Sequence, residues 1–262
     1  MPGSLAQRMR DGEILLGSFH ALRDPTLIEL VAYCGFDFVM IEYEHGVRDV
    51  ETVQHLIRAA EVGGVEVLVR IAVDDVGLIG RFLDAGASGV MVAHVSDAAA
   101  AEAAVRAAMY PPEGSRGLGF GRRQARDGVS RGDWGDPVRL NQDTLVFAIV
   151  EDPEGVQNID SIVRVPGLSG ITPGSGDLAL SQGLDRAHPT VLGQVDRIYD
   201  AVRSKDDQFL MAFLVDDPSA VAHAVSRGAT LLLFGLDSMM IPKMYKQLIA
   251  AVRDALASPE PA

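Results

Sequence analysis

Short apolar runs rich in β-branched residues alternate with amphipathic segments along the whole chain. The runs have the length and composition of buried strands, and the segments between them have apolar positions at helical spacing. The predicted strands are Leu15–Leu22, Phe36–Tyr43, Glu66–Val73, Ala87–Val95, Leu145–Asp152, Leu168–Gly174, Gln208–Val215 and Ala229–Gly235. The predicted helices are Pro25–Cys34, Val50–Val62, Val76–Ala85, Ala98–Met109, Glu154–Val163, Pro189–Ser204, Pro218–Ser226 and Ser238–Ala257.

The residues between these elements support the same rhythm. Glycine follows several predicted helices, as in CGFDF and SRGATLL, and Asp or Asp-Pro opens several others, as in EDPEG. Glycine readily takes the left-handed conformation that ends a helix, and an Asp side chain accepts from free amides of the first turn. Eight strand-helix units in 262 residues favour a single-domain (β/α)8 TIM barrel over residues 1–262. An open doubly wound sheet is the alternative, although no GxGxxG follows the first strand.

One long segment, residues 111–144, interrupts the alternation. It is rich in Gly and Arg and contains Trp134, the single tryptophan. A connection of this length inside a compact domain is usually functional or disordered. Arg116, Arg122 and Arg123 are candidates to receive the anionic end of a substrate, and a solvated surface loop is the alternative.

Charge and composition narrow the function classes. The net charge of -13 argues against a nucleic-acid or anionic-membrane partner, and no apolar run approaches the roughly 18 residues of a membrane helix. One cysteine, Cys34, cannot form an internal disulfide, which favours a reducing, cytoplasmic location. Cys34 follows an apolar helix face and is expected to be a buried, inert thiol.

Acidic residues follow two adjacent predicted strands. Glu151 ends the fifth strand, and Asp177 comes just after the Gly-rich turn that follows the sixth. Because active-site residues of barrels lie at the carboxyl ends of strands, these carboxylates are candidate ligands of a hard ion such as Mg²⁺ or Mn²⁺. The alternative is that each residue caps a helix.

Other polar residues also lie at the carboxyl ends of predicted strands. Arg70 could stabilise a developing enolate or form an ion pair with a barrel carboxylate. His45 could move a proton near neutral pH or lie in a surface loop. The lysines Lys205, Lys243 and Lys246 all lie in or after helices, so Schiff-base chemistry at a strand end is excluded.

Six segments together resemble the HpcH/HpaI aldolase family of metal-dependent class II pyruvate aldolases. They are FDFVMIEYEHGVRDVETVQHLIRAA, LVRIAVDD, FLDAGASGVMVAHV, MYPPEGSRGLG, IVEDPEGVQNIDSI and GSGDLALSQG. The family includes 4-hydroxy-2-oxoheptanedioate aldolase and 2-dehydro-3-deoxyglucarate aldolase. The resemblance implies a barrel whose last helix is exchanged between subunits, in a homo-oligomer that is usually a hexamer built as a trimer of dimers.

The resemblance also implies roles for single residues. Glu151 and Asp177 correspond to the metal ligands, with Mg²⁺ or Mn²⁺ expected and Co²⁺ as a further candidate ion. The turn of Ser175 and Gly176, with the amide of Asp177, corresponds to the site that holds the pyruvate carboxylate.

The remaining implied roles concern the reacting atoms. His45 corresponds to the catalytic base, Asp84 to its acidic partner, and Arg70 to the residue that steadies the enolate oxygen. Asp84 is indicated by the resemblance alone, because its position at the end of a predicted helix carries no signal of its own.

This chain departs from the family pattern near the expected pocket. Ile149 stands where the family often has Gln, Glu42 where it has Asp, and Ser175 where it has Pro. After the fourth strand, Ala93 and His94 replace a Pro-Met pair. These changes predict a shifted substrate or reaction rather than loss of the metal.

The predicted activity is metal-dependent cleavage or formation of the carbon-carbon bond of a 4-hydroxy-2-oxo acid, from a 2-keto acid and an aldehyde. Oxaloacetate decarboxylation or a macrophomate-synthase-like enolate addition would use the same enolate and is the main alternative. A CoA-ester lyase of the citrate-lyase type and a non-catalytic keto-acid-binding barrel are further alternatives.

Overall fold

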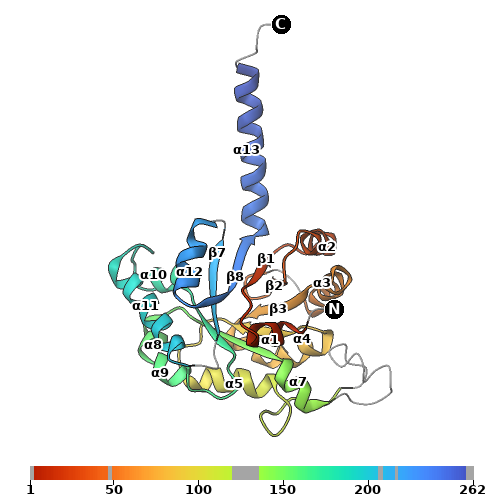
Figure 1. The fold of residues 1–262 in the computed structure, drawn as a ribbon, viewed down its shortest axis with the longest axis vertical. Coiled ribbons are helices and arrows are strands. Elements are labelled where there is room, and N and C mark those ends of the chain that lie inside the picture. The colour runs from red at the N-terminus through yellow and green to blue at the C-terminus, as the bar shows by residue number, and fades with distance from the viewer. Residues whose placement is uncertain (1–2, 47–48, 120–135, 206–208, 216–217, 258–262) are drawn as a thin grey trace.

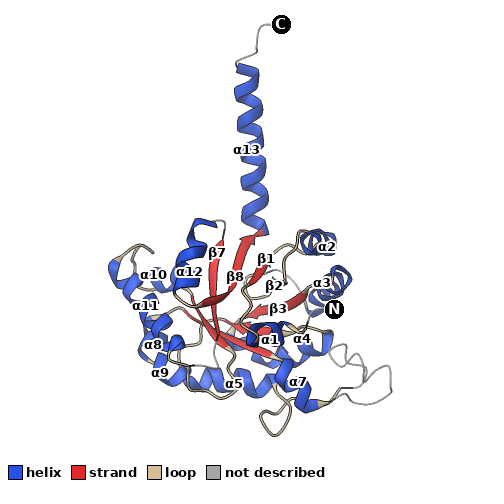
Figure 2. Ribbon diagram, in the orientation of Figure 1, coloured by secondary structure: helices blue, strands red, loops and turns tan. Residues whose placement is uncertain are grey.

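Eight parallel strands close into a barrel surrounded by helices (Figure 1, Figure 2). The computed structural model describes residues 3–46, 49–119, 136–205, 209–215 and 218–257. Each strand pairs with the next in the chain, and β8 closes the sheet on β1. The strands are β1 (Leu15–His20), β2 (Phe38–Glu42), β3 (Glu66–Ile71), β4 (Gly89–Val92), β5 (Leu145–Val150), β6 (Gly170–Pro173), β7 (Phe209–Val215) and β8 (Ala229–Leu236). The predicted (β/α)8 fold is therefore confirmed.

The helices follow the predicted order with local differences. They are α1 (Leu5–Arg10), α2 (Pro25–Tyr33), α3 (Val50–Gly63), the 3₁₀ helix η1 (Val73–Leu78), α4 (Ile79–Ala85), α5 (Ala98–Ala108), α7 (Pro137–Asp143), α8 (Pro153–Gln157), α9 (Ile159–Ile162), α10 (Ser175–Leu180), α11 (Pro189–Arg203), the 3₁₀ helix η2 (Pro218–Ala220), α12 (Val221–Ser226) and α13 (Asp237–Ala257). The predicted helix Glu154–Val163 is two short helices, because Asn158 leaves the helical conformation at their junction.

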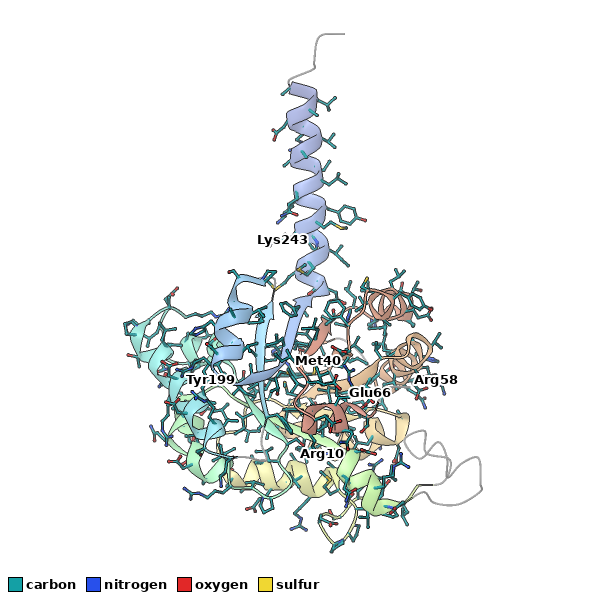
Figure 3. All side chains as sticks on the ribbon, viewed as in Figure 1. Arg10, Met40, Arg58, Glu66, Tyr199 and Lys243 are labelled. Carbon is teal, nitrogen blue, oxygen red and sulfur yellow. The ribbon has the colours of Figure 1, made fainter. Side chains whose placement is uncertain are left out.

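Alternation of side chains along the strands produces two apolar layers. On β2, Phe38 and Met40, the latter labelled in Figure 3, belong to the cluster that fills the barrel, whereas Val39 and Ile41 belong to the cluster beneath the surrounding helices. Successive side chains of a strand point to opposite faces, so both layers follow directly from the period-two spacing. The interior is a packed core, as expected for a barrel of eight strands.

Helix α13 departs from the barrel instead of covering it (Figure 1). Its root is fixed by Asp237, whose carboxylate accepts hydrogen bonds from the backbone N–H groups of Ala21 at 2.9 Å and Ser238 at 2.7 Å. The buried imidazole of His20 lies 3.3 Å from the same carboxylate. Beyond this root, α13 exposes the apolar side chains of Met239, Met240, Met244, Tyr245, Leu248, Ile249, Val252 and Leu256.

Two local expectations need correction or restriction. Cys34 is exposed, not buried, because it caps the end of α2 and its thiol donates to the carbonyl of Leu30. Within the excursion at 111–144, residues 137–143 form α7, while Arg122, Arg123 and Trp134 lie outside the described residues. In the described part of the chain, every helix is too short or too polar to cross a bilayer.

Candidate active site at the carboxyl end of the barrel

The strand alternation that fills the barrel also brings charged groups to its mouth. Glu42, Arg70 and Glu151 each come two residues after an interior apolar residue of their own strand. Glu42 of β2 is the register partner of Arg70 of β3. Period-two spacing therefore places a carboxylate, a guanidinium and a second carboxylate on top of the apolar core.

Arg70 is held between two acidic residues. Its Nε lies 2.8 Å from a carboxylate oxygen of Glu42, and its Nη2 lies 2.6 Å from Glu44 Oε2. The guanidinium also lies over the ring of Phe19, 5.6 Å from the centroid. Arg70 still lines the open pocket, so the predicted ion pair is present and the positive charge faces the cavity as well.

Glu151 is a buried carboxylate with few compensating donors. Its Oε1 accepts a 2.9 Å hydrogen bond from the backbone N–H of His94. Burial raises the pKa of Glu151 from its ordinary 4.5 to about 7; the His94 backbone bond opposes this rise, and the negative charge of Asp177 adds to it. A carboxylate with a raised pKa beside a second carboxylate is a group that a cation would stabilise.

In metal-free protein, Glu151→Gln is expected to stabilise the fold at high pH. A carboxyl group with a raised folded-state pKa costs stability as it ionises, so the cost is absent below pH 4.5, grows towards pH 7 and is complete above it. The upper limit of this cost to the free energy of unfolding is about 3 kcal/mol. Unfolding of both proteins in chelator should show a difference that widens between pH 5 and pH 8. Parallel pH profiles would contradict the raised pKa.

A glycine turn brings the second predicted ligand to the same cavity. A Cβ added to Gly174 would lie within 2.4 Å of Glu151 Oε2, so no larger residue lets the turn pass this close. The next three residues, Ser175, Gly176 and Asp177, line the pocket together with Glu151 and Arg70. Glu151 and the turn therefore share one wall of the cavity, as the sequence predicts.

A second acidic cluster adjoins Glu151. Ligand atoms of Glu44, His94 and Glu151 all lie within 4.8 Å of one another, which is compatible with a shared metal ion. Asp177 is outside this cluster of three and lines the pocket together with Glu151. The carboxylates and the imidazole are a donor set that suits a divalent cation of intermediate hardness.

The predicted pair of His45 and Asp84 is not formed within one chain, as far as the described residues show. The imidazole of His45 is exposed and lies 3.6 Å from Glu44 Oε2. Asp84 instead pairs with Arg116 at 2.5 Å, and the Arg116 guanidinium is buried over the ring of Tyr110. Arg116 is therefore not available to receive a substrate anion, which corrects that expectation.

Several pocket residues carry no local signal in the sequence. Arg186, after α10, lines the cavity and donates to the Ser175 hydroxyl at 2.9 Å. Tyr199 of α11, labelled in Figure 3, and Met239 of α13 also line the cavity. They come from a loop and two helices, so the residues that follow the strands do not reveal them. The Ser-for-Pro departure at position 175 is the one sequence feature that points to this corner.

The chain matches a family model described as HpcH/HpaI aldolase/citrate lyase over residues 15–243. A "Hydroxypyruvate/pyruvate aldolase" of Pseudomonas aeruginosa is 28% identical, covering 97% of this chain and 94% of the relative. A "Pyruvate aldolase" of Rhizobium etli is 31% identical, covering 93% of this chain and 95% of the relative. Among solved structures, the citrate synthase SbnG superposes with a TM-score of 0.87 at 30% identity, covering 97% of this chain and 99% of that one.

Proposed function

The chain belongs to the HpcH/HpaI aldolase/citrate lyase family, and from this premise we propose that it cleaves and forms the carbon-carbon bond of 4-hydroxy-2-oxo acids. Class II pyruvate aldolases are carbon-carbon lyases that pass through an enolate of pyruvate type. The observation that supports this activity best is the juxtaposition of Glu151, Asp177 and Arg70 in one pocket at the carboxyl end of the barrel.

Glu151 and Asp177 are the residues that we propose to hold a divalent ion, Mg²⁺, Mn²⁺ or Co²⁺. The buried Glu151 carboxylate, with its raised pKa and the Asp177 charge beside it, fits such an ion. A bound divalent cation supplies Lewis-acid stabilisation to a keto oxygen that becomes an enolate.

The protein's own groups account for the remaining steps. The turn amides of Gly176 and Asp177, beside the Ser175 hydroxyl, bind the carboxylate of the 2-keto acid. Arg70 faces the pocket with a fixed positive charge and stabilises negative charge that develops on the 2-oxo oxygen.

His45 is the proposed proton carrier for the 4-hydroxyl group. Its backbone N–H donates to Glu42 at 3.0 Å, and its exposed ring lies near Glu44, so it is anchored yet accessible at the mouth. Glu44 is the carboxylate that orients it within one chain. The role of Asp84 stays a prediction, because its partner in the same chain is Arg116.

We also propose that α13 is exchanged between subunits of a homo-oligomer. A helix that follows β8 would ordinarily cover the wall between β8 and β1, but α13 projects away (Figure 1). Leu16 on the outer face of β1 and Leu30 on α2 are left exposed, as is the apolar side of α13. A second copy of the chain supplies both complementary surfaces at once.

Enolate formation tests the proposed function directly. The enzyme with Mn²⁺ should catalyse exchange of the C3 protons of pyruvate with solvent deuterium and cleave 4-hydroxy-2-oxo acids to pyruvate and an aldehyde. Arg70→Ala should slow the exchange about 10²–10³-fold, the loss typical of removing one electrostatic donor. Proton NMR of pyruvate in deuterated buffer gives the rate.

The matched control is Arg70→Lys, which keeps a positive charge near Glu42 and Glu44 and should retain more exchange than Arg70→Ala. Unchanged exchange in Arg70→Ala would assign Arg70 to structure alone. Product analysis with oxaloacetate, with and without an aldehyde, distinguishes aldol addition from plain decarboxylation.

A further inference from the structure

We propose that Nδ1 of His94 is a direct ligand of the divalent ion at Glu151, so that the site has a nitrogen donor in addition to its carboxylates. The inference rests on the proposed metal-dependent function and concerns the composition of that site. His94 stands where the family pattern has a different residue, and it belongs to the cluster with Glu44 and Glu151.

The backbone of His94 is arranged around Glu151. Its φ of 57° places it in the left-handed region, uncommon for a residue with a side chain. In this conformation, both the N–H and the ring of His94 reach Glu151, the N–H at 2.9 Å from Oε1 and Nδ1 at 3.4 Å from the same oxygen. Unusual backbone conformations that bring two groups of one residue to a buried carboxylate are typical of functional sites.

The two ring nitrogens of His94 face two different carboxylates. Nε2 lies 3.2 Å from Glu44 Oε1, while Nδ1 lies 3.4 Å from Glu151 Oε1. A neutral imidazole carries one N–H, and the tautomer with that proton on Nε2, facing Glu44, leaves the Nδ1 lone pair directed at a carboxylate oxygen. Two such electron pairs repel unless a proton or a metal ion lies between them.

The distance between His94 Nδ1 and Glu151 Oε1 suits two ligands of one ion. Metal-nitrogen and metal-oxygen bonds of about 2.0–2.2 Å at tetrahedral to octahedral angles put ligand atoms roughly 3.0–3.5 Å apart. The 3.4 Å between Nδ1 and Glu151 Oε1 falls in that interval. Part of the His94 side chain is exposed, so an ion can reach the position from the pocket side.

Glu44 lies beside Nε2, the ring nitrogen of His94 that does not face Glu151. Histidine ligands usually donate their second ring N–H to a carboxylate, which fixes the tautomer and raises ligand basicity. The side chain of Glu44 is almost fully buried; its Oε1 lies 3.2 Å from His94 Nε2, and its Oε2 pairs with Arg70 at 2.6 Å. Arg70, Glu44 and His94 therefore form a chain of contacts that ends at the ion.

A nitrogen ligand changes which ions the site prefers. Oxygen-only sites suit Mg²⁺ and Mn²⁺, whereas an imidazole favours Co²⁺ and the later divalent ions. We expect affinity for Co²⁺ to fall about 10–100-fold when the imidazole is removed. Affinity for Mg²⁺, which depends on the carboxylates, should change less.

Pulsed electron paramagnetic resonance on Mn²⁺ tests the proposal without relying on activity. Tag-free protein, free of added histidines, is titrated with Mn²⁺ to one equivalent, and the echo modulation is recorded. The wild-type complex should show coupling to ¹⁴N. His94→Asn, which tolerates the left-handed backbone and removes the imidazole, should bind Mn²⁺ without that coupling.

His45→Asn is the matched control, because His45 also contacts Glu44 but no hydrogen bond or ion pair joins it to Glu151 among the described residues. It should retain the ¹⁴N signal. Tightly bound Mn²⁺ without nitrogen coupling in the wild type, or equal coupling in His94→Asn, would overturn the His94 assignment and leave the aldolase proposal standing. Failure of the wild type to bind Mn²⁺ at all would overturn both.

Discussion

Glu151→Gln is expected to reduce aldol cleavage at least about 10²–10³-fold, the loss typical of removing one strong electrostatic group, because the proposed ion then lacks its buried anchor. Gln is nearly isosteric and keeps an oxygen for the His94 N–H. The change therefore removes charge with little disturbance of the barrel mouth. Chelator treatment of the wild type should have the same effect, and added Mg²⁺ or Mn²⁺ should restore activity to the wild type alone.

The measurement is the initial rate of pyruvate release from a 4-hydroxy-2-oxo acid, with metal content determined on the same samples. Glu154→Gln is the control, since Glu154 is an exposed carboxylate on α8 a few residues away and should leave the rate unchanged. Full activity of the wild type in excess chelator would remove the metal from the proposed function.

Leu248→Glu combined with Ile249→Glu should convert the proposed oligomer to monomers. Both side chains are about half exposed on α13, where exchange between subunits would bury them. Burial of each is worth about 1.5–3 kcal/mol, and a twofold contact counts every substitution twice. The combined loss exceeds what a stable dimer contact tolerates.

Sedimentation at several protein concentrations gives the assembly state. Lys246→Glu changes charge on the same helix without removing apolar surface, and it should leave the assembly intact. If the double variant sediments like the wild type, α13 does not hold the subunits together. A wild type that is monomeric at all concentrations would rule out the exchanged helix itself.

The barrel and its strands could be predicted from the sequence because each strand is a short, bounded apolar run rich in β-branched residues. The strand boundaries differ from the predicted ones by one to three residues. The helix at α8 and α9 and the start of α4 differed more, because Asn158 and the segment Val73–Leu78 adopt tighter local conformations that apolar spacing does not reveal.

The residues of the site also fall into two groups, those that the sequence predicts and those that it does not. The place of Glu151 and Arg70 in the site was predictable because each follows the apolar interior residues of its strand at period-two spacing. A charged side chain at such a position is not needed for core packing and therefore indicates a function. The contacts of His94 and Arg186 were not, because they depend on loop conformation and on residues far away in the chain. The pairing of Asp84 with Arg116 depends on a contact across 32 positions, which no local pattern encodes.

Met239, in the first turn of α13, forms part of the pocket wall, while the rest of that helix leaves the barrel. In the proposed oligomer, subunit association and ligand binding would therefore both depend on this one helix. Any cooperativity between the two equilibria must be reciprocal, with the same free energy in both directions. If the proposed exchange of α13 couples the two, diluting the enzyme would change its apparent affinity for the keto acid, and the keto acid would change the dissociation of subunits to the same extent.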